Sequence, residues 1–300
     1  MTAFSTPLSR KLGLRYPIVA APMFIISNKE MIVACAEAGI LGSMPSLNAR
    51  TIEQFRADLE WIRARTDKPF AINMTIRLTH PERLEQDVQL CEEFDVPVWL
   101  TSYGNPTEFV KRARAKGAHV FHDVVNLKHA KKAEQAGVDG IIGVSAGAGG
   151  HAGRISPYAL IPYLRDNLSV PVLAAGCIST GRQIAASLAL GAELVYMGTC
   201  FIPSKECGAP PDYKQMVVDA GPEDIVYTDK VSGVHANFLR DSMPEDWSPG
   251  EELKGAKRWV DTWSAGQGVT EIHDQKSIEQ IVEQLVREYH DAVAALPRSA

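Results

Sequence analysis

A histidine surrounded by glycines is the first candidate for chemistry in this sequence. In the stretch GVSAGAGGHAGRISP, residues 143–157, His151 lies among Gly147, Gly149, Gly150 and Gly153. Small neighbours leave open space around an imidazole, and an imidazole exchanges a proton near neutral pH. The stretch therefore predicts a general base in an open cavity. The alternative is a histidine that only ties down its loop through a backbone hydrogen bond.

Two further loops have the residues of an anion site. LAAGCIST contains Gly176 and is followed by a helix that we expect to begin near residues 179–182, and MGTCF contains Gly198 and Thr199. Glycine lets backbone amides approach a ligand closely, and amides at a helix start favour a negative charge. We expect these loops to bind a phosphate, with tight turns that bind nothing as the alternative.

The phosphate can belong to a substrate or to a cofactor, and Met23 and Asn73 favour FMN. A flexible apolar Met packs on a flat ring, and an Asn amide bonds to its polar edge. A Met that is only part of the core is the other interpretation.

His119, His122 and Asp123 lie close together in the sequence and are candidate metal ligands. The period of two along a strand puts His122 and Asp123 on opposite faces, which disfavours one shared ion. We therefore expect no metal site, and we expect the His122 ring to point inward near the flavin.

The elements that position these residues form a regular repeat along the sequence. Eight short apolar runs alternate with helix-like stretches, and several lack the in/out alternation of half-exposed strands, as is typical of strands buried on both faces. The runs are PIVAAPM, ILGSM, PFAINM, PVWLTS, HVFHDVV, GIIGVSA, PVLAAG and LVYMGT, from residue 17 to residue 199.

The helices between the runs have recognisable ends and faces. SNKEMIVACAEAG has Ser27 or Asn28 as an N-cap and ends at Gly39, and TIEQFRADLEWIRART puts Ile52, Phe55, Leu59 and Ile62 on one face. Eight such repeats predict an α/β fold, a closed (β/α)8 TIM barrel, in preference to an open doubly wound sheet, although sequence alone does not show closure.

The repeat ends after residue 200. The following stretch is rich in prolines and acidic residues, and a final amphipathic helix is expected from about Ser277 to Ala295. We predict a barrel formed by residues 1–205 and 270–300, with a small, mostly helical C-terminal excursion over 206–269 on the substrate side. In a barrel, the functional residues follow the carboxyl ends of the strands.

Composition narrows the class of protein. The 300 residues are 45% hydrophobic with a net charge of −5, which argues against nucleic acid or an anionic membrane as a partner. The five cysteines form no CxxC pair, as expected of reduced thiols in a cytoplasmic protein. No apolar run approaches the roughly 18 residues of a membrane span, and the first residues lack the apolar run of a signal peptide.

Several of these motifs together resemble the FMN-dependent nitronate monooxygenases, formerly called 2-nitropropane dioxygenases. They are PIVAAPM, FAINMT, GAGGHAG, VPVLAAGCISTGRQIAASLALGAELVYMGTCF and WSAGQG, and the similarity covers roughly residues 7–290. The resemblance implies a TIM barrel with a smaller added domain, and an enzyme that oxidatively denitrifies alkyl nitronates with O2. It also implies that His151 is the catalytic base. The implied flavin contacts are Ala21, Pro22, Met23, Asn73, Gly149, Gly150, Gly176, Gly198 and Thr199.

Two positions depart from the pattern of the resembling family. Asp123 follows His122 where many relatives have a basic or amide residue, and a carboxylate near the flavin would disfavour its anionic reduced form. SGVHANFLR has Val234 and His235 in place of an arginine-containing segment. Both departures leave the substrate and the electron donor open.

Other functions therefore stay open beside the nitronate monooxygenase. They are an NAD(P)H-dependent flavin reductase of the quinone or enoyl-acyl carrier type, a flavin-free barrel lyase or isomerase acting on a phosphorylated substrate, and a non-catalytic barrel that binds FMN or phosphate. The absence of a GxGxxG motif does not decide among them. The expected ligand is a small anion, and a homodimer stays open as the assembly.

Overall fold

The computed structural model describes residues 4–245, 247–248, 251–252 and 260–297. All eight predicted strands are present and form one parallel sheet in the order β1-β9-β8-β6-β5-β4-β3-β2. They are β1 (Ile18–Ala20), β2 (Gly42–Pro45), β3 (Phe70–Thr75), β4 (Val98–Ser102), β5 (His119–Val124), β6 (Gly140–Val144), β8 (Val172–Ala175) and β9 (Leu194–Met197).

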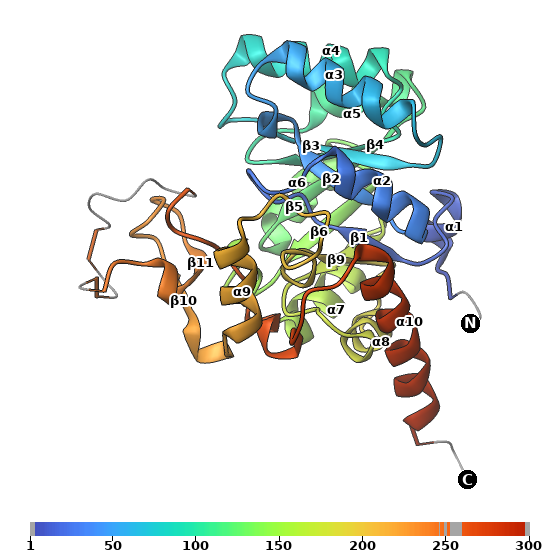
Figure 1. The fold of residues 1–300 in the computed structure, drawn as a ribbon. Coiled ribbons are helices and arrows are strands. Elements are labelled where there is room, and N and C mark those ends of the chain that lie inside the picture. The colour runs from blue at the N-terminus through green and yellow to red at the C-terminus, as the bar shows by residue number, and fades with distance from the viewer. Residues whose placement is uncertain (1–3, 246, 249–250, 253–259, 298–300) are drawn as a thin grey trace.

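The sheet closes on itself between its first and last strands. A parallel bridge joins Val19 to Leu41, and the Leu41 amide donates to the Ile18 carbonyl over 3.0 Å. The fold is therefore the predicted TIM barrel, and the open doubly wound sheet is excluded (Figure 1).

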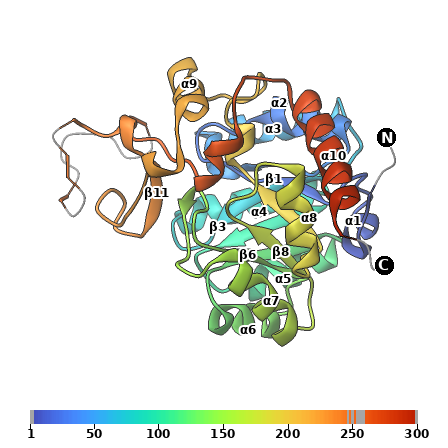
Figure 2. The ribbon, with the colours of Figure 1, turned by 90° about the horizontal axis from the view of Figure 1, so that it is seen from below.

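Helices surround the strands, as Figure 2 shows. They are α2 (Lys29–Ala38), α3 (Ile52–Arg63), α4 (Pro81–Glu93), α5 (Thr107–Ala115), α6 (Leu127–Gln135), α7 (Pro157–Asn167), α8 (Gly181–Ala189) and α10 (Ile278–Ala295), with the short α1 (Pro7–Lys11) before β1. The last helix, α10, packs against both α8 and α2, so it completes the ring of helices although it comes from the end of the chain.

Local sequence signals set the helix ends. Asn28, rather than Ser27, caps α2, because its side chain accepts a hydrogen bond from the Met31 amide at 2.8 Å, and Gly39 ends the helix in the left-handed conformation with φ of 83°. The buried face of α3 contains Phe55, Leu59 and Ile62, as the periodicity predicts. The last helix is capped by Ser277, which confirms the expected final helix.

Alternate residues of the strands fill the barrel. Val19, Leu100, Phe121, Ile142 and Leu173 belong to a buried cluster inside it, which the leucines of the α1 region join. The residues between them contact the surrounding helices instead. The position of Phe121 therefore fixes which side chains of β5 point inward, and the same alternation applies to each strand.

The segment from 206 to 269 contains α9 (Pro211–Asp219) and two strands, β10 (Ile225–Thr228) and β11 (Ala236–Leu239). These strands form a small antiparallel sheet with β7 (Gly150–His151), in the order β10-β11-β7. The expectation of a mostly helical segment omits both strands, because they are only four residues long and lie among prolines and glycines.

In the described part of the chain, no helix is both long and apolar enough to cross a membrane. All five cysteines are free thiols.

Candidate active site

A cavity of about 1930 Å³ lies at the carboxyl ends of the barrel strands. All eleven residues that the sequence analysis assigned to catalysis or to the flavin line it. They are Ala21, Pro22, Met23, Asn73, His122, Gly149, Gly150, His151, Gly176, Gly198 and Thr199. The structure thus brings residues from most of the βα loops to one place, as expected at this end of a barrel.

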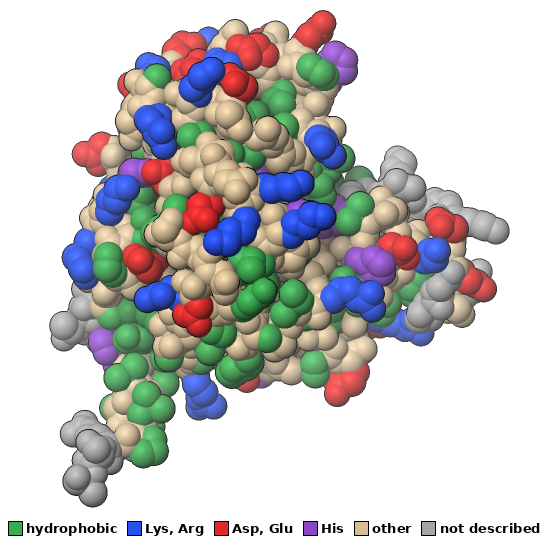
Figure 3. Space-filling model, turned by 180° about the vertical axis from the view of Figure 1, so that it is seen from behind, with side chains coloured by type: hydrophobic (Ala, Val, Ile, Leu, Met, Phe, Trp, Pro, Cys, Tyr) green, Lys and Arg blue, Asp and Glu red, His purple; other side chains and the backbone are tan. Residues whose placement is uncertain are grey.

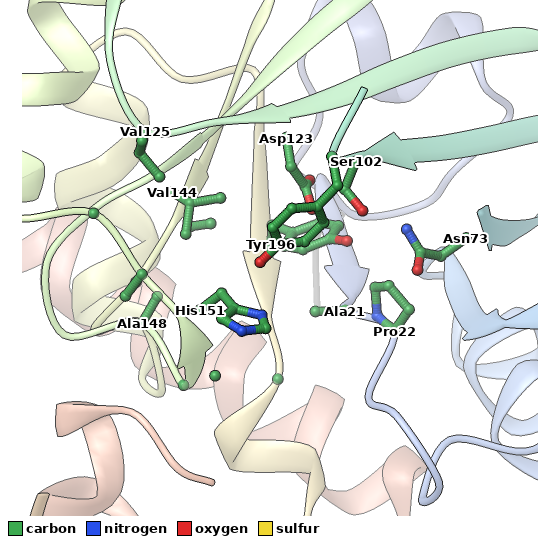
Figure 4. Close-up of a pocket in the computed structure, with 18 of the residues that line it drawn as sticks. Ala21, Pro22, Asn73, Ser102, Asp123, Val125, Val144, Ala148, His151 and Tyr196 are labelled. Carbon is green, nitrogen blue, oxygen red and sulfur yellow. The ribbon is translucent and has the colours of Figure 1, made fainter. Parts of the chain in front are cut away.

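Polar side chains that point into the barrel form the floor of the cavity. Asn73, Ser102, Asp123 and Tyr196 follow the interior residues of β3, β4, β5 and β9 by two positions, and Figure 4 shows them facing the cavity. Asn73 donates to the Leu100 carbonyl over 3.3 Å. The side chain of Asn73 also lines the cavity.

Asp123 is a half-buried acid with one fully buried carboxyl oxygen. Its Oδ1 atom has no hydrogen-bond partner among the described residues, and burial raises its pKa to about 7. The Tyr196 hydroxyl is likewise buried without a partner in the described part of the chain. Burial, and secondarily the charge of Asp123, raises the pKa of both Tyr196 and Tyr103. At neutral pH the two tyrosines are therefore neutral, and Asp123 is only partly ionised.

His151 is held in place by the small antiparallel sheet. It is the second residue of β7 and pairs with Ala236 of β11, while Gly150 pairs with Asn237. The buried Asn237 amide donates to the Ala148 carbonyl over 2.7 Å and so ties the glycine loop to β11. The segment after residue 200, which the sequence did not connect to this loop, thus positions the histidine.

The imidazole of His151 stands in the cavity above the floor (Figure 4). Its ring packs edge-on against Tyr103 with centroids 5.3 Å apart, and its Nε2 lies 3.3 Å from the Ser232 hydroxyl. Burial lowers the pKa of His151 from its ordinary value. The ring is consequently neutral at neutral pH and able to accept a proton.

The loops after β8 and β9 form the end of the cavity suited to a phosphate. Gly176 adopts a φ of 114°, and a Cβ there would lie 2.5 Å from the Ser145 hydroxyl, so only glycine fits. The Ser179 hydroxyl is buried and has no partner among the described residues. Gly198 precedes a 3₁₀ turn (Thr199–Phe201), whose first amides point outward from its start.

A second glycine loop supports this end. The Gly266 amide donates to Thr199 Oγ1 over 2.9 Å, and the Gln267 amide donates to the Gly147 carbonyl over 2.9 Å. A Cβ at Gly149 would lie 2.9 Å from the Gly266 nitrogen, so the two loops meet closely. The WSAGQG motif thus packs against the GAGGH motif and shapes the same cavity.

These features fit FMN. Glycine-lined loops and an unsatisfied Ser179 hydroxyl suit a phosphate, while the Asn73 amide and the apolar residues after β1 suit a flat ring with a polar edge. The sequence places Tyr103 and Ser179 at strand and helix ends but assigns no role to their side chains, and it does not single out Tyr196. Ser179 lies within the quoted LAAGCIST loop, and Tyr196 follows from the alternation along β9.

His122 does not join the inward-facing residues. Phe121 points into the barrel, so Asp123 does as well, while His122 points outward and its Nδ1 lies 2.8 Å from the Thr101 hydroxyl. Burial, together with the nearby His129, lowers the pKa of His122 to about 4. The expected inward orientation of the His122 ring is therefore wrong and Asp123 points inward instead, although His122 still lines the cavity.

The described residues contain no group of three His, Cys, Asp or Glu side chains arranged to hold a metal. His119 pairs with Asp139 over 3.4 Å, away from His122. Val234 and His235, which depart from the family pattern as Asp123 does, also line the cavity. The His235 ring stacks on Tyr227 with centroids 5.0 Å apart. Both departures therefore lie where they can affect the choice of substrate.

Comparison with known proteins finds similar sequences and similar structures. The sequence profile of the nitronate monooxygenase family matches residues 5–89 and 76–249. A probable nitronate monooxygenase of Staphylococcus saprophyticus is 26% identical over 93% of this chain and 97% of its own length.

Two further proteins are similar to this chain. The (3aS,4S,5R,7aS)-5-hydroxy-7a-methyl-1-oxo-octahydro-1H-indene-4-carboxyl-CoA dehydrogenase of Mycobacterium tuberculosis is 30% identical over 83% of this chain and 70% of its own length. The structure of FabK from Thermotoga maritima superimposes with a TM-score of 0.85 at 30% identity, covering 97% of this chain and 98% of FabK.

Proposed function

The chain belongs to the nitronate monooxygenase family, and we propose that it is an FMN-dependent enzyme that oxidises alkyl nitronates and their parent nitroalkanes with O2. As a member it is a flavin oxidoreductase, which sets aside a flavin-free lyase or isomerase. The observation that supports the proposal most is the position of His151, a neutral imidazole facing a polar floor in a cavity with a phosphate-binding end.

The barrel loops would hold the cofactor. Ala21, Pro22 and Met23 line the cavity after β1, and Asn73 faces it from β3. Gly149, Gly150, Gly176, Gly198 and Thr199 would let backbone amides reach the flavin and its phosphate. When bound, FMN supplies the electron acceptor for the substrate carbon. We assign residues 1–205 and 270–300 to the cofactor-binding barrel and 206–269 to the substrate side.

His151 would take the proton from the carbon beside the nitro group. A neutral nitroalkane is a weak carbon acid, so its oxidation needs a base that is unprotonated at working pH. The lowered pKa of His151 meets that requirement, and the contacts with Tyr103 and Ser232 orient the ring. A nitronate has already lost this proton and would need His151 only for positioning.

The proposal is tested by the spectrum and the products of the purified protein. We expect a yellow protein with flavin absorbance that releases nitrite from an alkyl nitronate in air. A colourless protein that does not bind added FMN would refute the assignment of the cofactor. A flavoprotein that forms no nitrite from any nitronate would refute the assignment of the substrate.

A second candidate is an NAD(P)H-dependent reductase or dehydrogenase acting on a larger substrate. The cavity of about 1930 Å³ exceeds the roughly 300–1000 Å³ of common ligand pockets, so it has room for more than a flavin and a small anion. The similar protein of Mycobacterium tuberculosis is a carboxyl-CoA dehydrogenase. Rapid anaerobic bleaching of the flavin by NADH or NADPH, without nitrite formation from nitronates, would favour this candidate.

A further inference from the structure

The charged side chains that line the cavity are unevenly distributed. Arg77, Lys132 and Arg154 line it, whereas the half-buried Asp123 is the one acidic residue among the lining residues of the described chain. All three cations are exposed. The whole chain has a net charge of −5, so the excess of positive charge is local to this cavity.

These three cations are not neutralised by the protein. Within the described ranges, none of them forms an ion pair, and none of their side chains donates a hydrogen bond to the protein. By contrast, Lys131 next to Lys132 pairs with Glu134. Cations left unpaired around a concave surface attract an anionic ligand.

Backbone contacts place the three cations around neighbouring loops. Arg77 adjoins the loop after β4, because its amide donates to the Tyr103 carbonyl over 3.1 Å. Lys132 lies on α6, after β5. Arg154 follows Gly153, where a Cβ would lie 3.2 Å from the Cβ of Val125 at the end of β5. We call these three residues the basic rim.

The basic rim and the phosphate end follow different strands of the barrel. Arg77 follows β3, Lys132 lies on α6 after β5, and Arg154 lies in the loop after β6. Because the phosphate end is formed by the loops after β8 and β9, a flavin phosphate held there would leave these three cations free for another ligand. In Figure 3, Lys, Arg and His side chains lie next to one another where the barrel adjoins the segment after residue 200.

We propose that the basic rim binds the diphosphate of a nucleotide carrier, either a coenzyme A thioester or a nicotinamide dinucleotide, whose reactive end reaches His151. Three cations from three separate segments are more than the single negative charge of a small nitronate requires, and Arg forks and Lys ammonium groups are the usual partners of phosphate oxygens. His129, which also lines the extension toward α6, adds a further donor. The inference rests on the proposed flavin site, because a bound nucleotide carrier can react in this cavity only if the flavin is there to exchange electrons with it.

Equilibrium binding to the FMN-loaded protein tests the rim directly. Coenzyme A, NADPH and adenosine are titrated separately by calorimetry under low and moderate salt. We expect coenzyme A or NADPH to bind, to weaken as salt increases, and to bind more tightly than adenosine, which has no phosphate. Whichever of the two binds identifies the source of the diphosphate.

Matched variants assign the binding to the rim. Lys132→Gln combined with Arg154→Gln should raise the Kd at least about tenfold, the effect of losing charge-assisted bonds to phosphate. Arg77→Gln should raise it several-fold. Lys128→Gln is the control, because Lys128 is an exposed lysine on the same helix that does not line the cavity, and its Kd should stay within about twofold of the wild type.

Three results would overturn the proposal. They are nucleotides that bind no better than adenosine, a double variant that binds like the wild type, and a Lys128→Gln variant that loses as much affinity as the double variant. Flavin content and nitrite formation are measured on the same samples. A protein that binds coenzyme A or NADPH but forms no nitrite would refute the proposed nitronate substrate and leave the rim supported.

Discussion

Replacement of Asp123 by Asn should make the stability of the protein less sensitive to pH. Asp123 is half-buried in the cavity floor, its buried Oδ1 has no partner among the described residues, and burial of the carboxyl group raises its pKa to about 7. Its folded-state pKa lies above its unfolded value, so the folded protein binds the proton more tightly than the unfolded chain. The wild type therefore loses stability as the pH rises from about 4 to about 7, and the Asn variant does not.

The size of the effect follows from the two pKa values. In the unfolded chain the acid is ionised at both about pH 5 and about pH 8.5, whereas in the folded protein it changes from protonated to ionised between them. With pKa values of 3.8 and about 7, the wild type loses up to about 3 kcal/mol of unfolding free energy over this range. Water entering the cavity screens the charge and reduces the expected loss to about 1–3 kcal/mol.

The assay is equilibrium urea unfolding of both proteins at about pH 5 and about pH 8.5. Relative to the wild type, Asp123→Asn should be more stable at the higher pH than at the lower pH, by about 1–3 kcal/mol of unfolding free energy. Asp166→Asn, a change of an exposed aspartate on α7, should show the same difference at both pH values. If the unfolding free energies of the two Asn variants change with pH in the same way relative to the wild type, the raised pKa of Asp123 is refuted.

Three further predictions concern the loops around the cavity. Gly176→Ala should weaken flavin binding at least about tenfold, because φ and the nearby Ser145 hydroxyl exclude a Cβ; an unchanged flavin Kd would contradict this. Asn237→Ala removes the donor to the Ala148 carbonyl and should cost about 1–3 kcal/mol of unfolding free energy and lower kcat/KM; a variant unchanged in both would show that β11 does not position the loop. Because the pKa of His151 is lowered from its ordinary value of 6.5, kcat/KM for a neutral nitroalkane should stay constant as the pH falls to 6.5 and decrease only at a lower pH; an acid limb with a pKa at or above 6.5 in the rate profile would exclude His151 as the base.

The raised pKa of Asp123 also changes an expectation from the sequence. A carboxylate at this position would disfavour a negative charge on the reduced flavin, but a protonated acid does not. Below about pH 7 Asp123 is neutral, so it can donate a hydrogen bond instead of repelling charge. Burial is a property of the folded chain, and for this reason the residue type alone did not show it.

The barrel itself was predictable from the sequence. Its strands are short apolar runs separated by capped helices, and signals such as Asn28 and Gly39 are local. Closure was not predictable, because it depends on the bridge between Val19 and Leu41, which each strand's own sequence does not specify. The glycine loops after β8 and β9 were found because barrel sites follow the strand ends.

The site was only partly predictable. The pairing of Gly150 and His151 with β11 involves a two-residue strand and a partner more than eighty residues later, so no periodicity indicates it. The orientation of His122 was inferable, because Phe121 is a large apolar residue that belongs in the core, and the alternation then puts Asp123 inward. The alternation of side chains along β5, rather than the chemistry of the imidazole, decides which residue points inward.

The most direct test of the account is an anaerobic absorbance measurement that separates proton removal from electron transfer. A neutral nitroalkane and its preformed nitronate are each mixed with the FMN-loaded wild type and with His151→Asn. We predict that the nitronate bleaches the flavin in both proteins, whereas the nitroalkane bleaches the wild type at least about a hundredfold faster than the variant. Failure of both compounds to bleach the wild-type flavin, or equal rates with the nitroalkane in the two proteins, would contradict the proposal that His151 is the base of a nitronate-oxidising flavoenzyme.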